Sequence, residues 1–202
     1  MSLSLSSPAF AQNQKIPAQF SRDGGNLSPP VEWQGAPAGT RSFALIVEDP
    51  DAPMGTFRHW AAYDIPGDAR RLAEGAGSRE QGAALQMGTN DFGNTQYDGP
   101  QPPAGHGTHH YHFRLFALDV PELEVPASCS ADDILAAAED HALDEADVVG
   151  TFERRMADKP GIGEEAQGVE RDIASADKKA RTGSEDEKVR DTPPAGDYND
   201  LA

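Results

Sequence analysis

Apolar residues gather in short runs that predict β-strands. Residues 42–47 form such a run and stop at Glu48-Asp49-Pro50, which is typical of a strand buried on both faces. Residues 59–65 form a second predicted strand, which Pro66-Gly67 stops. Proline and glycine separate the runs, as the turns of an all-β fold require.

Residues 109–118 predict a third and longer strand, because polarity alternates along them. One face would carry His109, Tyr111, Phe113 and Leu115, and the other His110, His112, Arg114 and Phe116. Residues 145–156 fit either a short strand or a second helix, and 148–152 suit a closing strand.

One helix is predicted after Ser130, which is a good N-cap residue. Asp132 and Asp133 would lie in its first turn, where the helix dipole favours negative charge. The expected apolar stripe consists of Ile134, Leu135, Ala138 and Ala142, with a break near residues 143–144.

Composition divides the chain into two parts. Residues 1–157 hold both tryptophans, all eight phenylalanines and all six histidines, whereas Tyr198 is the sole aromatic residue beyond them. Residues 158–202 cannot bury enough apolar area to offset chain entropy, so we expect a disordered or weakly helical tail. The predicted fold class is mostly β, with one domain over 1–157 and an acidic tail over 158–202.

Charge limits the partners. The chain has 34 acidic and 17 basic residues, and residues 1–157 alone carry 22 and 10. This field repels phosphate backbones and anionic lipid surfaces, so we expect no nucleic acid and no stable membrane insertion. The same negative charge favours basic protein partners.

Cysteine content and the N-terminus bear on the compartment. Cys129 is the sole cysteine, which excludes an internal disulfide and a cysteine-rich zinc site, and we expect it half-buried near the helix start. Residues 1–11 lack the basic and apolar segments of a signal peptide, and no apolar run reaches the roughly 20 residues that span a bilayer. These features predict a cytoplasmic protein.

Two polar features follow the predicted strands. Asp49-Pro50-Asp51-Ala52-Pro53 forms a stiff turn with two carboxylates, which the spacing alone explains as aspartate capping its own backbone. His59 stands at the entrance of the second strand, where a lone histidine is more often structural than functional.

The densest histidine region, residues 105–112, has several interpretations. His110 and His112 share a strand face and could ligate Zn²⁺ or Ni²⁺, or simply lie on the surface. Alternatively, His109 and Tyr111 share the other face and could donate hydrogen bonds to an anion. The long loop over 88–103 is dense in turn residues, and Phe92 and Tyr97 predict that it is packed.

Together these motifs are similar to those of the phosphatidylethanolamine-binding family. The matching segments are Asp49-Pro50-Asp51-Ala52-Pro53, His59-Trp60 and Gly107-Thr108-His109-His110-Tyr111. Residues 24–33, Asn90-Asp91-Phe92-Gly93 and Gly99-Pro100 resemble its bacterial branch, named Raf-kinase-inhibitor-like (YbhB/YbcL type). The resemblance covers about residues 5–156.

The resemblance implies a β-sandwich of two sheets with a few peripheral helices and an anion pocket at one end. The implied ligand-binding residues are Asp49, Pro53, His59, His109 and Tyr111, supported by Asp51, Gly107 and Thr108. The implied ligands are phosphate, carboxylate or phosphoethanolamine-like groups. This chain departs from the family in carrying His110 where an arginine is frequent, and Arg22 and Gln101 where cysteines are common.

The leading functional hypothesis is therefore an anion-binding module with a regulatory role toward a kinase or protease. It needs no cofactor, and the resemblance allows a homodimer. One alternative is a hydrolase using Asp49 with His59 or His109, although no nucleophile motif is present. The other is a metal-binding protein using His106, His109, His110 and His112.

Overall fold

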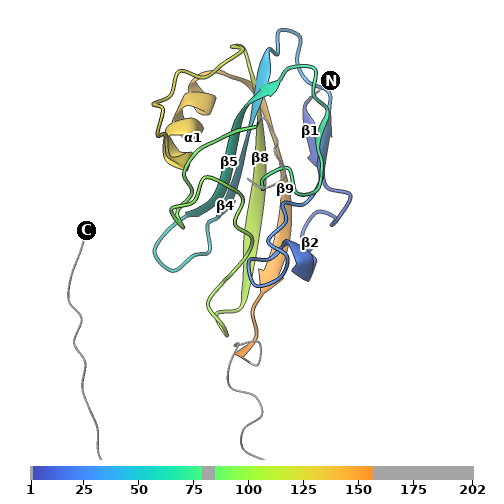
Figure 1. The fold of residues 1–202 in the computed structure, drawn as a ribbon. Helices are drawn as coiled ribbons and strands as arrows, with labels where there is room; N and C mark the ends of the chain where they lie inside the picture. Colours follow the sequence, from blue (N-terminus) through green and yellow to red (C-terminus); the bar gives the residue numbers. More distant parts are fainter. Residues whose placement is uncertain (1, 79–84, 157–202) are drawn as a thin grey trace, which may run out of the picture. The chain divides into compact units, whose positions relative to one another are not determined.

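The computed structural model describes residues 2–78 and 85–156, which form two β-sheets (Figure 1). The larger sheet has the strand order β2-β9-β8-β4-β5-β7 and the smaller has β1-β3-β6. The strands of the larger sheet are β2 Gln14–Lys15, β4 Ser42–Asp49, β5 Phe57–Pro66, β7 Gln86–Met87, β8 Thr108–Leu118 and β9 Ala142–Glu153. Those of the smaller sheet are β1 Ser4–Ser6, β3 Val31–Gln34 and β6 Arg71–Leu72. The predicted tail, residues 158–202, lies outside the described residues.

The three predicted central strands are confirmed as β4, β5 and β8, and β4 lies between the other two. β4 is buried on both faces because different elements cover them. Phe43, Leu45 and Val47 belong to the core shared with the smaller sheet. Ala44 and Ile46 pack with the buried face of the helix on the other side, and Figure 1 shows α1 and β1 flanking the large sheet.

The predicted alternation in β8 is also present. His109, Tyr111, Phe113 and Leu115 are all buried, whereas His110 is exposed and His112 and Arg114 are half-buried. Phe116 is buried as well, because it reaches the part of the outer face that the helix covers.

The helix α1, Ala131–Asp140, begins as predicted. The Ser130 hydroxyl accepts a hydrogen bond from the Asp133 backbone N–H, and the Asp133 carboxylate accepts one from the Ser130 backbone. The expected stripe is wrong at Ala142, which is exposed and pairs with Leu118 as the first residue of β9. The second-helix alternative for 145–156 is therefore wrong.

Cys129 is fully buried rather than half-buried, because it packs with the apolar face of α1. The helices of the described residues are α1 and the 3₁₀ turn Ala18–Phe20. None of the helices in residues 2–78 and 85–156 is long and apolar enough to cross a membrane.

The sheet topology brings three strand ends together. β4 runs antiparallel to both β5 and β8, with Asp49 opposite Phe57 and Glu48 opposite His112. The last residue of β4 therefore lies beside the first residue of β5 and close to the start of β8. The turn after β4 and the loop before β8 meet at the same edge, which is where the polar motifs of the sequence lie.

Candidate ligand-binding site

A pocket of about 170 Å³ lies at this edge of the large sheet. Its wall contains all five residues that the family resemblance implies for ligand binding, together with six others. The lining residues are Asp49, Ala52, Pro53, Phe57, His59, Phe92, Gln101, Pro102, Pro103, His109 and Tyr111. A pocket this small suits a headgroup or small acid rather than a drug-sized ligand, for which about 300–1,000 Å³ is usual.

Asp49 organises the turn and one histidine. Its Oδ1 accepts a hydrogen bond from the Asp51 backbone N–H at 2.9 Å, and its Oδ2 lies 2.7 Å from His109 Nδ1. Asp49 therefore does two things: it caps its own turn, and it orients a histidine, as the family resemblance implies. The Asp49 side chain is buried, and each of its oxygens already has a partner.

His109 is bonded on both sides of its ring. Nδ1 faces Asp49, and Nε2 lies 2.8 Å from Nδ1 of His106. His109 is buried and His106 is exposed, so the three side chains form a hydrogen-bonded chain from the pocket wall to solvent. In this arrangement His109 has no free ring N–H for a ligand. The sequence analysis grouped His106 with His109 only as candidate metal ligands, and not as a hydrogen-bonded pair.

His59 is bonded on one side of its ring. Its Nδ1 lies 2.7 Å from the Asp98 carbonyl oxygen, and Nε2 makes no hydrogen bond within the described part of the chain. Burial lowers the pKa of His59, although the neighbouring Asp98 and Gly99 carbonyls and the charges of Asp49 and Asp98 oppose the shift.

Tyr111 places a hydroxyl group in the pocket wall. The side chain is buried, and its hydroxyl makes no hydrogen bond of ordinary geometry to a described residue, although the Asp49 carboxylate lies nearby. Burial, and after it the charge of Asp49 and the contact with its carboxylate, raises the pKa of Tyr111 well above its ordinary value, so the hydroxyl stays protonated. The Tyr111 ring meets the edge of the His59 ring at 5.2 Å between centroids.

Three aromatic rings of the pocket lining pack together as an aromatic wall. The rings of Phe57, His59 and Phe92 meet edge to face, with centroids 4.7–5.4 Å apart. The Arg22 guanidinium stacks over Phe92 at 4.1 Å from its centroid. Phe57 and Phe92 were not among the predicted site residues, because they come from segments 35 positions apart with no shared motif.

The buried carboxylate of Asp98 fixes the loop that carries Phe92. It accepts hydrogen bonds from the side-chain amides of Asn26 at 3.1 Å, Asn90 at 2.8 Å and Asn94 at 2.9 Å. Burial alone would raise the pKa of Asp98, but these amides outweigh it and lower the pKa. The loop is packed, as predicted, and the Tyr97 hydroxyl donates a hydrogen bond to the Phe20 carbonyl that anchors it.

The predicted supporting residues lie outside the pocket lining. Asp51 Oδ2 accepts hydrogen bonds from the backbone N–H of His110 at 2.9 Å and from its Nδ1 at 2.8 Å, which ties the turn to β8. His110 thus pairs with Asp51 at the position where the resembled family frequently has arginine. Gly107 has a φ of +92°, which favours glycine, and Thr108 begins β8 with an exposed side chain.

Arg22 and Gln101, the positions where cysteines are common in the resembled family, are neighbours. Arg22 Nη1 donates to Gln101 Oε1 at 2.9 Å, and the Arg22 backbone N–H donates to the Pro100 carbonyl at 3.2 Å. Because Gln101 lines the pocket, this polar contact links the pocket wall to the N-terminal segment.

The four histidines considered for a metal do not form a metal site in the described residues, although His106 and His109 are in contact. Within residues 2–78 and 85–156, no group of three or more histidine, cysteine or acidic side chains is placed to hold a metal ion. His112 instead lies 3.5 Å from Asp147, on the opposite face of the sheet from His109 and Tyr111. The hydrolase alternative gains no nucleophile either, because Tyr111 carries the sole hydroxyl or thiol group among the described residues lining the pocket.

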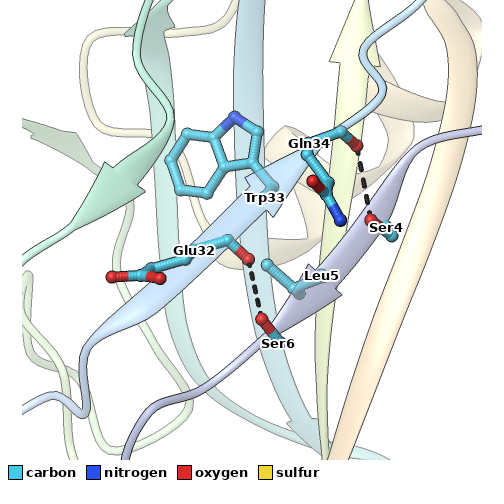
Figure 2. Close-up of a pocket in the computed structure, with 6 residues that line it drawn as sticks. All are labelled: Ser4, Leu5, Ser6, Glu32, Trp33 and Gln34. Atoms are coloured by element: carbon cyan, nitrogen blue, oxygen red, sulfur yellow. Dashed lines mark hydrogen bonds between the residues drawn. The ribbon is translucent and has the colours of Figure 1, made fainter.

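A second and larger hollow, of about 420 Å³, lies on the smaller sheet (Figure 2). Strands β1 and β3 line it, with the hydroxyl groups of Ser4 and Ser6 directed to backbone carbonyls of β3. Glu32 is its sole charged lining residue, so it lacks the convergent polar groups of the first pocket.

Comparison with known proteins identifies the family. The family model described as phosphatidylethanolamine-binding protein matches residues 6–153. A UPF0098 protein of Aquifex aeolicus is 41% identical over 148 residues, covering 73% of this chain and 86% of that protein. A Mycobacterium tuberculosis protein named putative lipoprotein LppC is 41% identical over 154 residues, covering 75% of this chain and 71% of that protein.

A solved structure gives the same result. The crystal structure of Escherichia coli YbcL, described as a member of the mammalian PEBP family, superposes with a TM-score of 0.73 at 29% identity. The match covers 77% of this chain and all of the YbcL chain. Both the two-sheet fold and the family expected from the sequence are thereby confirmed. The chain belongs to the phosphatidylethanolamine-binding protein family.

Proposed function

We propose that this protein binds a small oxyacid group, such as phosphate, a carboxylate or a phosphoethanolamine-like headgroup, in the pocket at the end of β4, β5 and β8. The observation that carries the proposal is the buried Tyr111 hydroxyl, which lines the pocket and, with the Asp49 carboxylate nearby, makes no hydrogen bond of ordinary geometry to a described residue. A buried polar group without a partner costs about 1–3 kcal/mol, so a ligand oxygen that accepts a hydrogen bond from this hydroxyl recovers that energy.

The shape of the pocket supports the same ligand class. Phe57, Phe92 and the prolines supply apolar lining, and the rings of Tyr111 and His59, which carry polar groups, are in contact. Hydrogen bonds to a charged group are stronger in such partly dry surroundings. The net negative charge of the protein opposes anion capture at long range, so affinity has to come from these local contacts.

Titration of the full chain with inorganic phosphate tests the proposal. Tyr111→Phe deletes the hydroxyl alone and should weaken binding by about tenfold to a hundredfold, the value of one hydrogen bond to a charged group. Tyr63→Phe is the matched control, because its hydroxyl lies by Cys129, away from the pocket, and phosphate affinity should not change. Equal phosphate affinity in Tyr111→Phe and the unaltered protein would refute the proposed site.

The regulatory part of the proposal rests on family membership: ligand binding would modulate a protein partner such as a kinase or protease. The exposed turn after β4 forms part of the pocket rim, so a ligand there would change the surface offered to a partner. Affinity purification from native extract, with and without phosphate, tests it. Recovery of no kinase or protease in either condition would refute this part.

A further inference from the structure

The polar groups of the pocket differ in whether the protein already uses their bonding capacity. Asp49 accepts from the Asp51 backbone and faces His109 Nδ1, and His109 Nε2 is bonded to His106. Both ring nitrogens of His109 are therefore occupied, and each oxygen of Asp49 already accepts one hydrogen bond. The remaining capacity belongs to Tyr111 and His59, whose rings touch.

The hydrogen bond of His59 fixes its tautomer. A carbonyl oxygen can only accept, so the 2.7 Å contact with Asp98 places the proton on Nδ1. A neutral imidazole then presents a lone pair, and not a proton, at Nε2. Burial favours this neutral form, because it lowers the pKa of His59.

The charged groups around His59 do not alter this assignment. Asp49 on β4 and the Asp98 carboxylate favour the protonated ring, but Arg22 lies 3.4 Å from Asp98 and offsets part of that charge. Asparagine amides also donate hydrogen bonds to the Asp98 carboxylate. On β8, His109 is hydrogen-bonded to Asp49, and the Tyr111 hydroxyl carries no charge.

Among the described residues that line the pocket, the Tyr111 hydroxyl is therefore the donor and His59 Nε2 the acceptor whose rings lie in contact and that can meet one ligand group. We propose that the pocket binds an oxyacid group together with one proton, held between a ligand oxygen and His59 Nε2, and so selects protonated phosphates, phosphonates and carboxylic acids over fully ionised oxyanions such as sulfate. This inference rests on the proposed function and specifies its ligand class. A group with both X=O and X–OH satisfies Tyr111 and His59 at once.

The selection follows from lone-pair repulsion. A sulfate oxygen carries no proton, so at His59 two lone pairs would face each other unless the ring takes up a proton, which burial disfavours. We expect sulfate to bind at least tenfold more weakly than inorganic phosphate at about pH 8. Inorganic phosphate retains a P–OH group there, whereas a phosphomonoester loses its last one near a pKa of about 6.

Calorimetric titration of the full chain with inorganic phosphate, methyl phosphate and sulfate at about pH 6 and about pH 8 tests the inference. Inorganic phosphate should keep its affinity, whereas methyl phosphate should lose roughly tenfold per pH unit above the pKa of about 6. His59→Gln, whose amide can donate to the ligand, should bring sulfate and phosphate affinities close together. Tyr111→Phe is the matched control, because it should weaken all three ligands by the same factor and leave their ratios unchanged.

Two results would overturn the inference, and they are distinguishable. Saturable phosphate binding with equal sulfate affinity in the unaltered protein at about pH 8 would refute proton-coupled selection and leave the proposed function intact. Absence of saturable phosphate binding would refute both. If His59→Gln fails to melt cooperatively, the ligand series and its pH dependence in the unaltered protein still decide between these results.

Discussion

Asp98→Asn should destabilise the protein strongly, because the buried Asp98 carboxylate holds the loop of the pocket's aromatic wall. Three asparagine amides donate to its two oxygens at 2.8–3.1 Å. An asparagine offers one acceptor oxygen and brings an NH₂ group against those donors, which leaves about two buried polar groups unpaired. At about 1–3 kcal/mol for each unpaired group, the expected loss is about 2–6 kcal/mol.

This loss is a large part of the roughly 5–15 kcal/mol that stabilises an ordinary domain. Urea denaturation measures it, and with a slope of about 2 kcal/mol/M the midpoint should fall by at least about 1 M. Asp91→Asn is the matched control on the same loop, since Asp91 is exposed and accepts a hydrogen bond from the Arg58 backbone that asparagine can also accept. A loss below about 1 kcal/mol for Asp98→Asn, or equal losses in both variants, would refute the role given to this carboxylate.

Three further changes have expected outcomes. The pKa of His59 is lower in the folded state, so in mild acid the unfolded state binds a proton that the folded state does not. Stability should therefore fall as pH drops below about 6.5. In urea denaturation at several pH values, His59→Gln should remove that part of the pH dependence. The lowered pKa of Asp98 adds stability that is present above about pH 4 and lost in stronger acid, a step that Asp98→Asn should lack. Ser130→Ala removes the cap of α1 and should cost about 1 kcal/mol, with no change in phosphate affinity.

The sequence predicted those elements whose signals are local. The runs at 42–47, 59–65 and 109–118 are long enough to show their periodicity, and the Ser130 cap marks the helix start. Ala142 was misplaced because it fits the helical spacing, but pairing with Leu118 draws its backbone into β9. The smaller sheet was not located, because its strands have two to four residues and offer too short a pattern.

The site was predicted in part for a similar reason. Motif order identified the polar residues that the sheet topology brings together, including Asp49 and Tyr111. It could not show that His106 occupies His109 Nε2, which depends on the path of the loop through Gly105 and Gly107, both at positive φ. The free bonding capacity of the pocket therefore became visible only with the geometry.

Phosphate titration of the unaltered protein beside Tyr111→Phe and Tyr63→Phe tests the central claim most directly. The account predicts saturable binding that Tyr63→Phe retains and Tyr111→Phe weakens by about tenfold or more. Binding that is insensitive to Tyr111→Phe, or no saturable binding to the unaltered protein, would contradict it.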